Sequence, residues 1–129
     1  MKLNREELAW AAGLFDGEGN VGVFKAYDRK TFEAKRIMLS MAQTDPQVLE
    51  RFQRAVFGLG SINGPYNWKS PFKAKSRWVF RAGSFEHVQA IIAALWVFLS
   101  PVKLAQAKKA LVDYAEYRAN WTGRKLPSS

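Results

Sequence analysis

Three small residues recur at every fourth position near the start of the chain, and they constrain what can pack there. Ala9, Gly13 and Gly17 lie at i, i+4 and i+8. On a helix these positions form one stripe with almost no side chain. Another helix can approach such a stripe closely. The spacing leaves open whether that helix belongs to the same domain or to another copy.

The stripe falls in the first predicted helix, from about residue 5 to 16. Asn4 is a suitable N-cap, and Glu6 and Glu7 in the first turn suit the helix dipole. Positions 8–15 are all apolar or glycine, which predicts a helix buried on every side.

Strands and helices then alternate along the rest of the chain. Alternating apolar residues predict strands around residues 21–23 and 37–41, and a hairpin over 60–68 and 76–82. Asp45-Pro46, Ser84 and Ser100-Pro101 begin three further helices, the last of them ending near residue 118. We therefore expect an α+β domain over residues 1–121, with one four-stranded antiparallel sheet and helices on one face. Residues 122–129 are expected to form a loose tail.

Charge and composition narrow the function. The formal net charge is +9, and residues 25–81 hold 12 Lys or Arg against 4 Asp or Glu. A folded domain of this charge suggests a polyanionic partner. The absence of cysteine and the single histidine, His87, exclude thiolate, disulfide and histidine-rich metal chemistry.

No apolar run is long enough for a membrane span, and the first residues carry acids rather than a signal pattern. We therefore expect a soluble, intracellular protein, in the cytoplasm of a prokaryote or phage host or in an organelle.

Two acids lie at the C-terminal end of the first helix. The helix dipole disfavours Asp16 and Glu18 there by about 0.3–1 kcal/mol each. Their presence in a cation-rich chain indicates that they serve a bound cation, although exposed acids at a helix end are the alternative.

Residues 11–19, Ala-Ala-Gly-Leu-Phe-Asp-Gly-Glu-Gly, resemble the LAGLIDADG motif position by position. Ala stands for the first Leu, Phe for Ile, Gly for the second Ala and Glu for the second Asp. The resemblance covers residues 5–117 and implies the αββαββα homing-endonuclease fold, with a concave DNA-binding sheet face. It implies a site-specific endonuclease that hydrolyses double-stranded DNA across the minor groove, with Mg²⁺ or Mn²⁺ as cofactor. Because the motif occurs once, it also implies a homodimer and a roughly pseudo-palindromic target.

The same resemblance assigns roles to residues. Glu18 is the expected catalytic and metal-binding acid, and the Gly19 carbonyl a second metal ligand. Lys103 and Asp45 match positions that orient water and stabilise charge. Apart from the resemblance, a lysine at position 103 is expected to be a solvated helix residue, and Asp45 is expected to act as an N-cap. The expected dimer interface comprises Ala9, Ala12, Gly13, Asp16 and Gly17, with a structural role for Asp16.

DNA-binding residues are expected on the sheet face opposite the apolar one. They are Arg36, Met38, Ser40, Asn63, Asn67, Lys69, Lys73, Lys75, Arg77 and Arg81. The lysine run can also be an ordinary solvated hairpin tip. Strict alternation puts Lys25 and Tyr27 on the core side, unless a bulge or an early strand end near Phe24 turns them outward. The alternative function is a cleavage-inactive nucleic-acid-binding protein, such as an intron maturase or a DNA-binding regulator.

Overall fold

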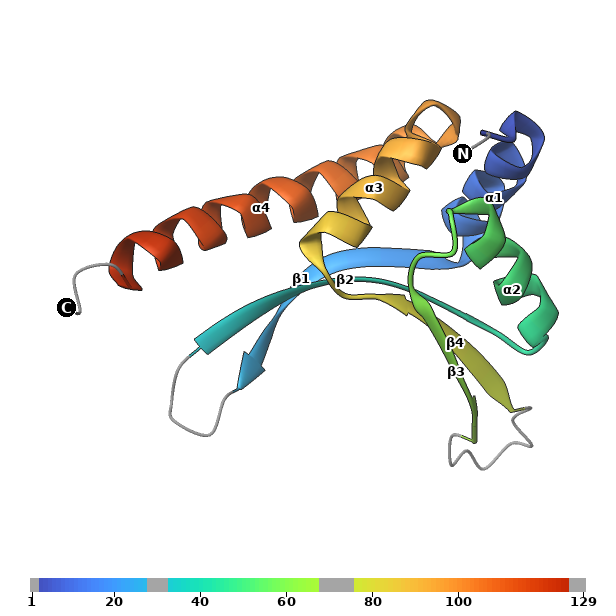
Figure 1. Cartoon of the computed structure of the whole chain (residues 1–129), viewed down its shortest axis with the longest axis horizontal. Coiled ribbons are helices and arrows are strands. Elements are labelled where there is room, and N and C mark those ends of the chain that lie inside the picture. The colour runs from blue at the N-terminus through green and yellow to red at the C-terminus, as the bar shows by residue number, and fades with distance from the viewer. Residues whose placement is uncertain (1–2, 28–32, 68–75, 126–129) are drawn as a thin grey trace.

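The computed structural model describes residues 3–27, 33–67 and 76–125. The predicted α+β class and order of elements are confirmed, and the helices lie together on one side of an arched sheet (Figure 1). In chain order the elements are α1 (Arg5–Glu18), β1 (Gly19–Tyr27), β2 (Glu33–Gln43), α2 (Pro46–Ala55), β3 (Ser61–Tyr66), β4 (Arg77–Ala82), α3 (Phe85–Leu95), the 3₁₀ turn η1 (Trp96–Phe98) and α4 (Pro101–Lys125).

The four strands form one antiparallel sheet in the order β1-β2-β4-β3. Side chains that face each other across paired strands lie on the same face of a sheet. Val21 pairs with Leu39, and Met41 pairs with Phe80. All four are buried under the helices. The opposite face is concave, and none of the helices in the described residues covers it (Figure 1).

Three phenylalanines link the helices to the sheet at the centre of the core. The Phe15 and Phe52 rings, from α1 and α2, have centroids 6.4 Å apart, and Phe52 meets Phe80 of β4 edge-on at 5.1 Å. All three are fully buried. This packing fixes the C-terminal end of α1 against the sheet, where the two motif acids lie.

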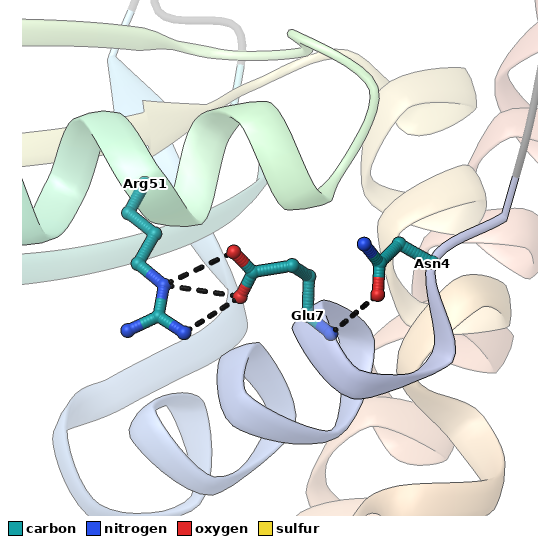
Figure 2. A network of polar contacts seen from close by, with 3 residues as sticks. All are labelled: Asn4, Glu7 and Arg51. Atoms are coloured by element: carbon teal, nitrogen blue, oxygen red, sulfur yellow. Dashed lines mark hydrogen bonds and ion pairs between the residues drawn. The ribbon is translucent and has the colours of Figure 1, made fainter.

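A second contact joins α1 to α2 at the surface. Arg51 binds both oxygens of the Glu7 carboxylate, with the shortest distance, from Nη2 to Oε2, at 2.7 Å (Figure 2). The guanidinium also lies over the Trp10 ring, 3.9 Å from its centroid. Hydrogen bonding from Arg51 lowers the pKa of Glu7 below its usual value. Asn4 caps α1 by accepting a hydrogen bond from the Glu7 backbone at 3.1 Å (Figure 2).

Several details differ from the sequence expectations. The first helix is not buried on every side, because Ala9, Gly13 and Gly17 are exposed. α4 continues to Lys125, so it includes residues 122–125 of the expected tail. Its long polar surface gave no sequence signal for where it ends.

The first strand pair also keeps a regular register, with no bulge after Phe24. Lys25 pairs with Lys35, on the same face as the Val23–Ile37 pair. Lys35 places its ammonium group over the Tyr117 ring of α4, 5.9 Å from the centroid. A lysine can remain on the helix side of the sheet there because its charged end reaches the edge of the core. The irregular register lies instead between Asn63 and Tyr66.

Candidate functional site

The candidate site begins where α1 ends and β1 starts. The Gly19 backbone N–H donates to the Phe15 carbonyl and closes the helix. A Cβ at Gly19 would collide with the Phe15 ring, so glycine is required here for space rather than for backbone conformation. Glu18, the residue before it, is exposed. No hydrogen bond or ion pair joins its carboxylate to another described residue, so an unpaired acid stands at the negative end of a helix.

Asp16 has a different environment. Its carboxylate oxygens accept hydrogen bonds from the Ser100 backbone N–H at 3.1 and 3.2 Å and from the Ser100 hydroxyl at 3.0 Å. Ser100 Oγ in turn accepts from the Lys103 backbone N–H at 3.3 Å. Asp16 therefore lies at the N-terminal end of α4, where the helix dipole favours an acid. These contacts join the end of α1 to the start of α4 within one copy of the chain.

Lys103 reaches back from α4 to the end of α1. Its Nζ donates to the Gly19 carbonyl oxygen at 2.7 Å and lies 5.4 Å from the centroid of the Phe15 ring. Lys103 is therefore not a solvated helix residue. The carbonyl expected to bind a metal instead has an ammonium group as its neighbour, so the chain itself puts a cation at this spot.

Asp45 behaves as an N-cap. It precedes α2 and accepts a hydrogen bond from the Gln47 backbone N–H at 2.9 Å. His87 lies in the first turn of α3, where its backbone N–H donates to the Ser84 hydroxyl at 3.1 Å. Within residues 3–27, 33–67 and 76–125, no three acidic or histidine side chains gather into a metal cluster. At the end of α1, one copy of the domain presents one unpaired acid, Glu18, next to one backbone carbonyl, that of Gly19.

The concave face carries the predicted polar and basic side chains. A row crosses all four strands, because Ser61 pairs with Arg81, Arg81 with Ser40, and Ser40 with Asn20. Arg36, Arg81 and Arg77 are exposed, and the Arg81 guanidinium lies 5.9 Å from the centroid of the Tyr66 ring. This surface is cationic and open to solvent.

The other predicted DNA contacts are distributed over the same face. Met38 and Ser40 are partly buried and Asn63 is exposed. Asn67 accepts a hydrogen bond from the Ser76 hydroxyl at 2.6 Å, which joins the two arms of the hairpin. Lys69, Lys73 and Lys75 lie outside the described residues.

Sequence reasoning missed two residues on this face. Asn20 and Phe24 alternate with Val21 and Val23, so the period that predicted the strand also placed them opposite the core. Phe24 pairs with Arg36 and is 45% exposed. Asn20 Oδ1 accepts a hydrogen bond from Gln106 Nε2 of α4 at 3.2 Å, a contact between positions 86 residues apart that no local pattern predicts.

The stripe on α1 is uncovered. A Cβ at Gly13 or Gly17 would have no neighbouring side chain or distant backbone within 4 Å among the described residues. None of the described residues therefore packs closely against the two glycines of the stripe. Ala12 differs from the expected interface set, because it is fully buried in the core and offers no surface to a partner. It lies one position from Gly13, which on a helix is a rotation of about 100° toward the core.

No helix in the described part of the chain is both long and apolar enough to cross a membrane.

Comparison with solved structures identifies the fold as that of the LAGLIDADG homing endonucleases. I-CvuI, in complex with the I-CreI target, matches with a TM-score of 0.67 at 22% identity, over 84% of this chain and 67% of that chain. I-CeuI, a group I intron-encoded homing endonuclease complexed with DNA, gives 0.69 at 18% identity, over 94% and 60%. The LAGLIDADG meganuclease I-AabMI, bound to uncleaved DNA, gives 0.66 at 17% identity, over 88% and 37%.

This chain thus spans about two thirds of the I-CvuI chain and just over a third of I-AabMI. Neither a family model nor a curated protein sequence matches it.

Proposed function

We propose that this protein is a site-specific endonuclease that hydrolyses double-stranded DNA with a divalent metal, as a pair of two copies. The observation that carries the proposal is the end of α1. There an unpaired, exposed carboxylate, Glu18, adjoins a carbonyl that already attracts the Lys103 ammonium at 2.7 Å. Glu18, Gly19 and Lys103 lie between the uncovered stripe of α1 and the cationic face of the sheet.

Glu18 and the Gly19 carbonyl would hold the metal. Both are oxygen donors, which Mg²⁺ or Mn²⁺ prefers, and an exposed site leaves room for the water molecules that Mg²⁺ keeps. The bound metal would activate water and stabilise the leaving oxygen. Lys103 Nζ donates to the Gly19 oxygen at 2.7 Å in this structure, so its ammonium would have to turn away from that oxygen when the metal binds, and it would then lie beside the phosphate. Asp45 would contribute less than Lys103 to orienting water and stabilising charge, since its carboxylate already caps α2.

A second copy would complete the site. Ala9, Gly13 and Gly17 form an exposed stripe that a matching helix can approach closely. Large exposed apolar side chains lie in segments near α1: Leu3 is 65% exposed, Val97 77% and Val102 81%. Arg5 of α1 lies over the Phe98 ring of η1, which shows that η1 and α1 are neighbours. Pairing along the stripe would bring two Glu18 carboxylates together, as cutting two strands across a groove about 6 Å wide requires.

The concave face would bind the DNA. Its arginines can contact phosphates or guanine edges, and asparagine can contact adenine. A twofold symmetric pair of faces would select a roughly pseudo-palindromic target. The similar solved structures of I-CvuI, I-CeuI and I-AabMI are complexes with DNA, which supports this assignment.

A cleavage selection tests the proposal. A randomised duplex library is incubated with the protein and Mg²⁺, and the new ends are captured and sequenced, with EDTA as the control. We expect one roughly pseudo-palindromic sequence to be cut on both strands, and none in EDTA. Enrichment of a bound sequence without any new ends would instead indicate a cleavage-inactive DNA-binding protein.

A further inference from the structure

A hollow opens on the uncovered sheet face between β1 and β2. Its volume is about 230 Å³, and it is lined by Asn20, Gly22, Val23, Phe24, Met38 and Ser40. It exists because Gly22 has no side chain: a Cβ there would meet nothing within 4 Å. Asn20 and Phe24 flank Gly22 along β1, and Met38 is its partner across the strand pair.

The two ends of the hollow differ in chemistry. Asn20 and Ser40, which pair with each other, supply hydrogen-bonding groups at one end. Phe24 supplies apolar surface at the other end, and Met38, opposite Gly22, supplies it in the middle. The Asn20 amide is held in place because its Oδ1 accepts from Gln106 Nε2 at 3.2 Å. Phe24 is 45% exposed, so the chain leaves a large aromatic ring uncovered in the middle of a polar face.

The charges around the hollow favour a polyanionic occupant. Phe24 is paired directly with the exposed Arg36, and Arg81 lies beside Ser40 on the next strand. An apolar protein surface or a neutral ligand would gain nothing from these cations. Duplex DNA meets both requirements, because its backbone is anionic and its major groove carries one apolar group, the C5 methyl of thymine.

We infer that the hollow above Gly22 receives a thymine C5 methyl, so that each half-site contains a required A·T pair. This inference rests on the proposed function. The methyl would lie against Phe24 and Met38. The Asn20 amide would face the adenine of the same pair or of its neighbour, since asparagine matches the adenine major-groove edge.

Replacing thymine by uracil tests the inference, since deoxyuridine lacks only the methyl group. The duplex recovered in the cleavage selection is synthesised with deoxyuridine at each thymine in turn, and binding of the wild-type protein is measured in EDTA. We expect one position per half-site to lose affinity about fourfold, the effect of one buried methyl-sized group. Substitution in both half-sites should cost about 15-fold, because distant sites add.

Variants connect that position to the hollow. Gly22→Val fills the space without strain, since its Cβ has no close neighbour and β-branched residues suit strands. It should abolish the difference in affinity between duplexes with thymine and duplexes with uracil at that position. Phe24→Ala removes the apolar wall at a position that is 45% exposed, and it should reduce the ratio of thymine to uracil affinity toward one. Asn63→Ala, on β3 of the same face but outside the hollow, is the matched control: its overall DNA affinity should fall, but it should keep the full difference between thymine and uracil.

The outcomes separate this inference from the proposed function. If the protein neither selects nor cuts any duplex, the proposed function fails and this inference with it. If it cuts a selected duplex but no thymine responds to uracil, only the methyl contact is overturned. The same holds if Gly22→Val and Phe24→Ala both keep the wild-type difference.

Discussion

Substitution of Gly13 by leucine should separate folding from pairing. In a single copy, the space above Gly13 is open, so leucine meets no described neighbour within 4 Å of its Cβ. Glycine inside a helix is about 0.8–1.0 kcal/mol less favourable than alanine, and leucine is close to alanine. The free energy of unfolding of the isolated domain should therefore rise by roughly 0.7 kcal/mol. For a chain of this size, that raises Tm by roughly 2–3 °C.

Pairing should respond in the opposite direction. A leucine pushed into a close helix contact costs about 1–3 kcal/mol, and twofold symmetry places two of them there. The total cost of about 2–6 kcal/mol corresponds to an increase in the dimer Kd of between about 30-fold and about 10⁴-fold. Cleavage should be lost together with the dimer.

Sedimentation measured over a range of protein concentrations gives Kd, and thermal unfolding at the lowest concentration gives Tm. Ala115→Leu, an exposed position on α4, is the matched control and should leave the dimer unchanged. If Gly13→Leu dimerises and cuts like the wild type, or if the wild type is active as a monomer, the stripe is not the interface.

Three further outcomes follow from the contacts described above. Asp16→Ala should lower the free energy of unfolding by about 1.5–3 kcal/mol in urea, because it removes hydrogen bonds between a carboxylate and Ser100; an unchanged urea midpoint would exclude that anchoring role. Arg51 lowers the pKa of Glu7, so their interaction stabilises the fold above the usual carboxyl pKa of 4.5 and is lost as pH falls through the lowered value. Urea unfolding from pH 7 to 3 should therefore show a smaller acid loss for Glu7→Gln than for the wild type, and identical profiles would contradict this. DNA affinity should fall with salt along a log–log slope of about −0.9 per phosphate contacted, and a flat response would contradict binding through the basic face.

Local sequence patterns predicted the elements and their beginnings. Asn4, Asp45 and Ser84 each accept a backbone hydrogen bond at the start of a helix, as capping chemistry dictates. The alternation that predicted β1 and β2 also gave the correct face for Arg36 and Met38. These features depend on residues that are close in the sequence, so they can be predicted from the sequence alone.

Features that depend on contacts between residues far apart in the sequence could not be predicted from local patterns. The partner of Asp16 is Ser100, 84 residues away. Glycine at position 19 is explained by the Phe15 ring, whose position depends on packing against Phe52. Small size alone could not show that Ala12 turns into the core while Gly13 faces out. The motif indicated that Lys103 lies near the site, but not that its Nζ binds the Gly19 carbonyl.

A paired measurement of binding and cutting on one duplex, for wild type and Glu18→Gln, tests the central claim most directly. The amide keeps the size of the side chain but removes the charge that would hold a metal. Glu18 is exposed and forms no hydrogen bond or ion pair with another described residue, so folding and pairing should survive the change. DNA affinity should remain at or above the wild-type value, because the lost charge repels phosphate. Cleavage with Mg²⁺ should fall by orders of magnitude, whereas cutting near the wild-type rate would contradict the proposed mechanism.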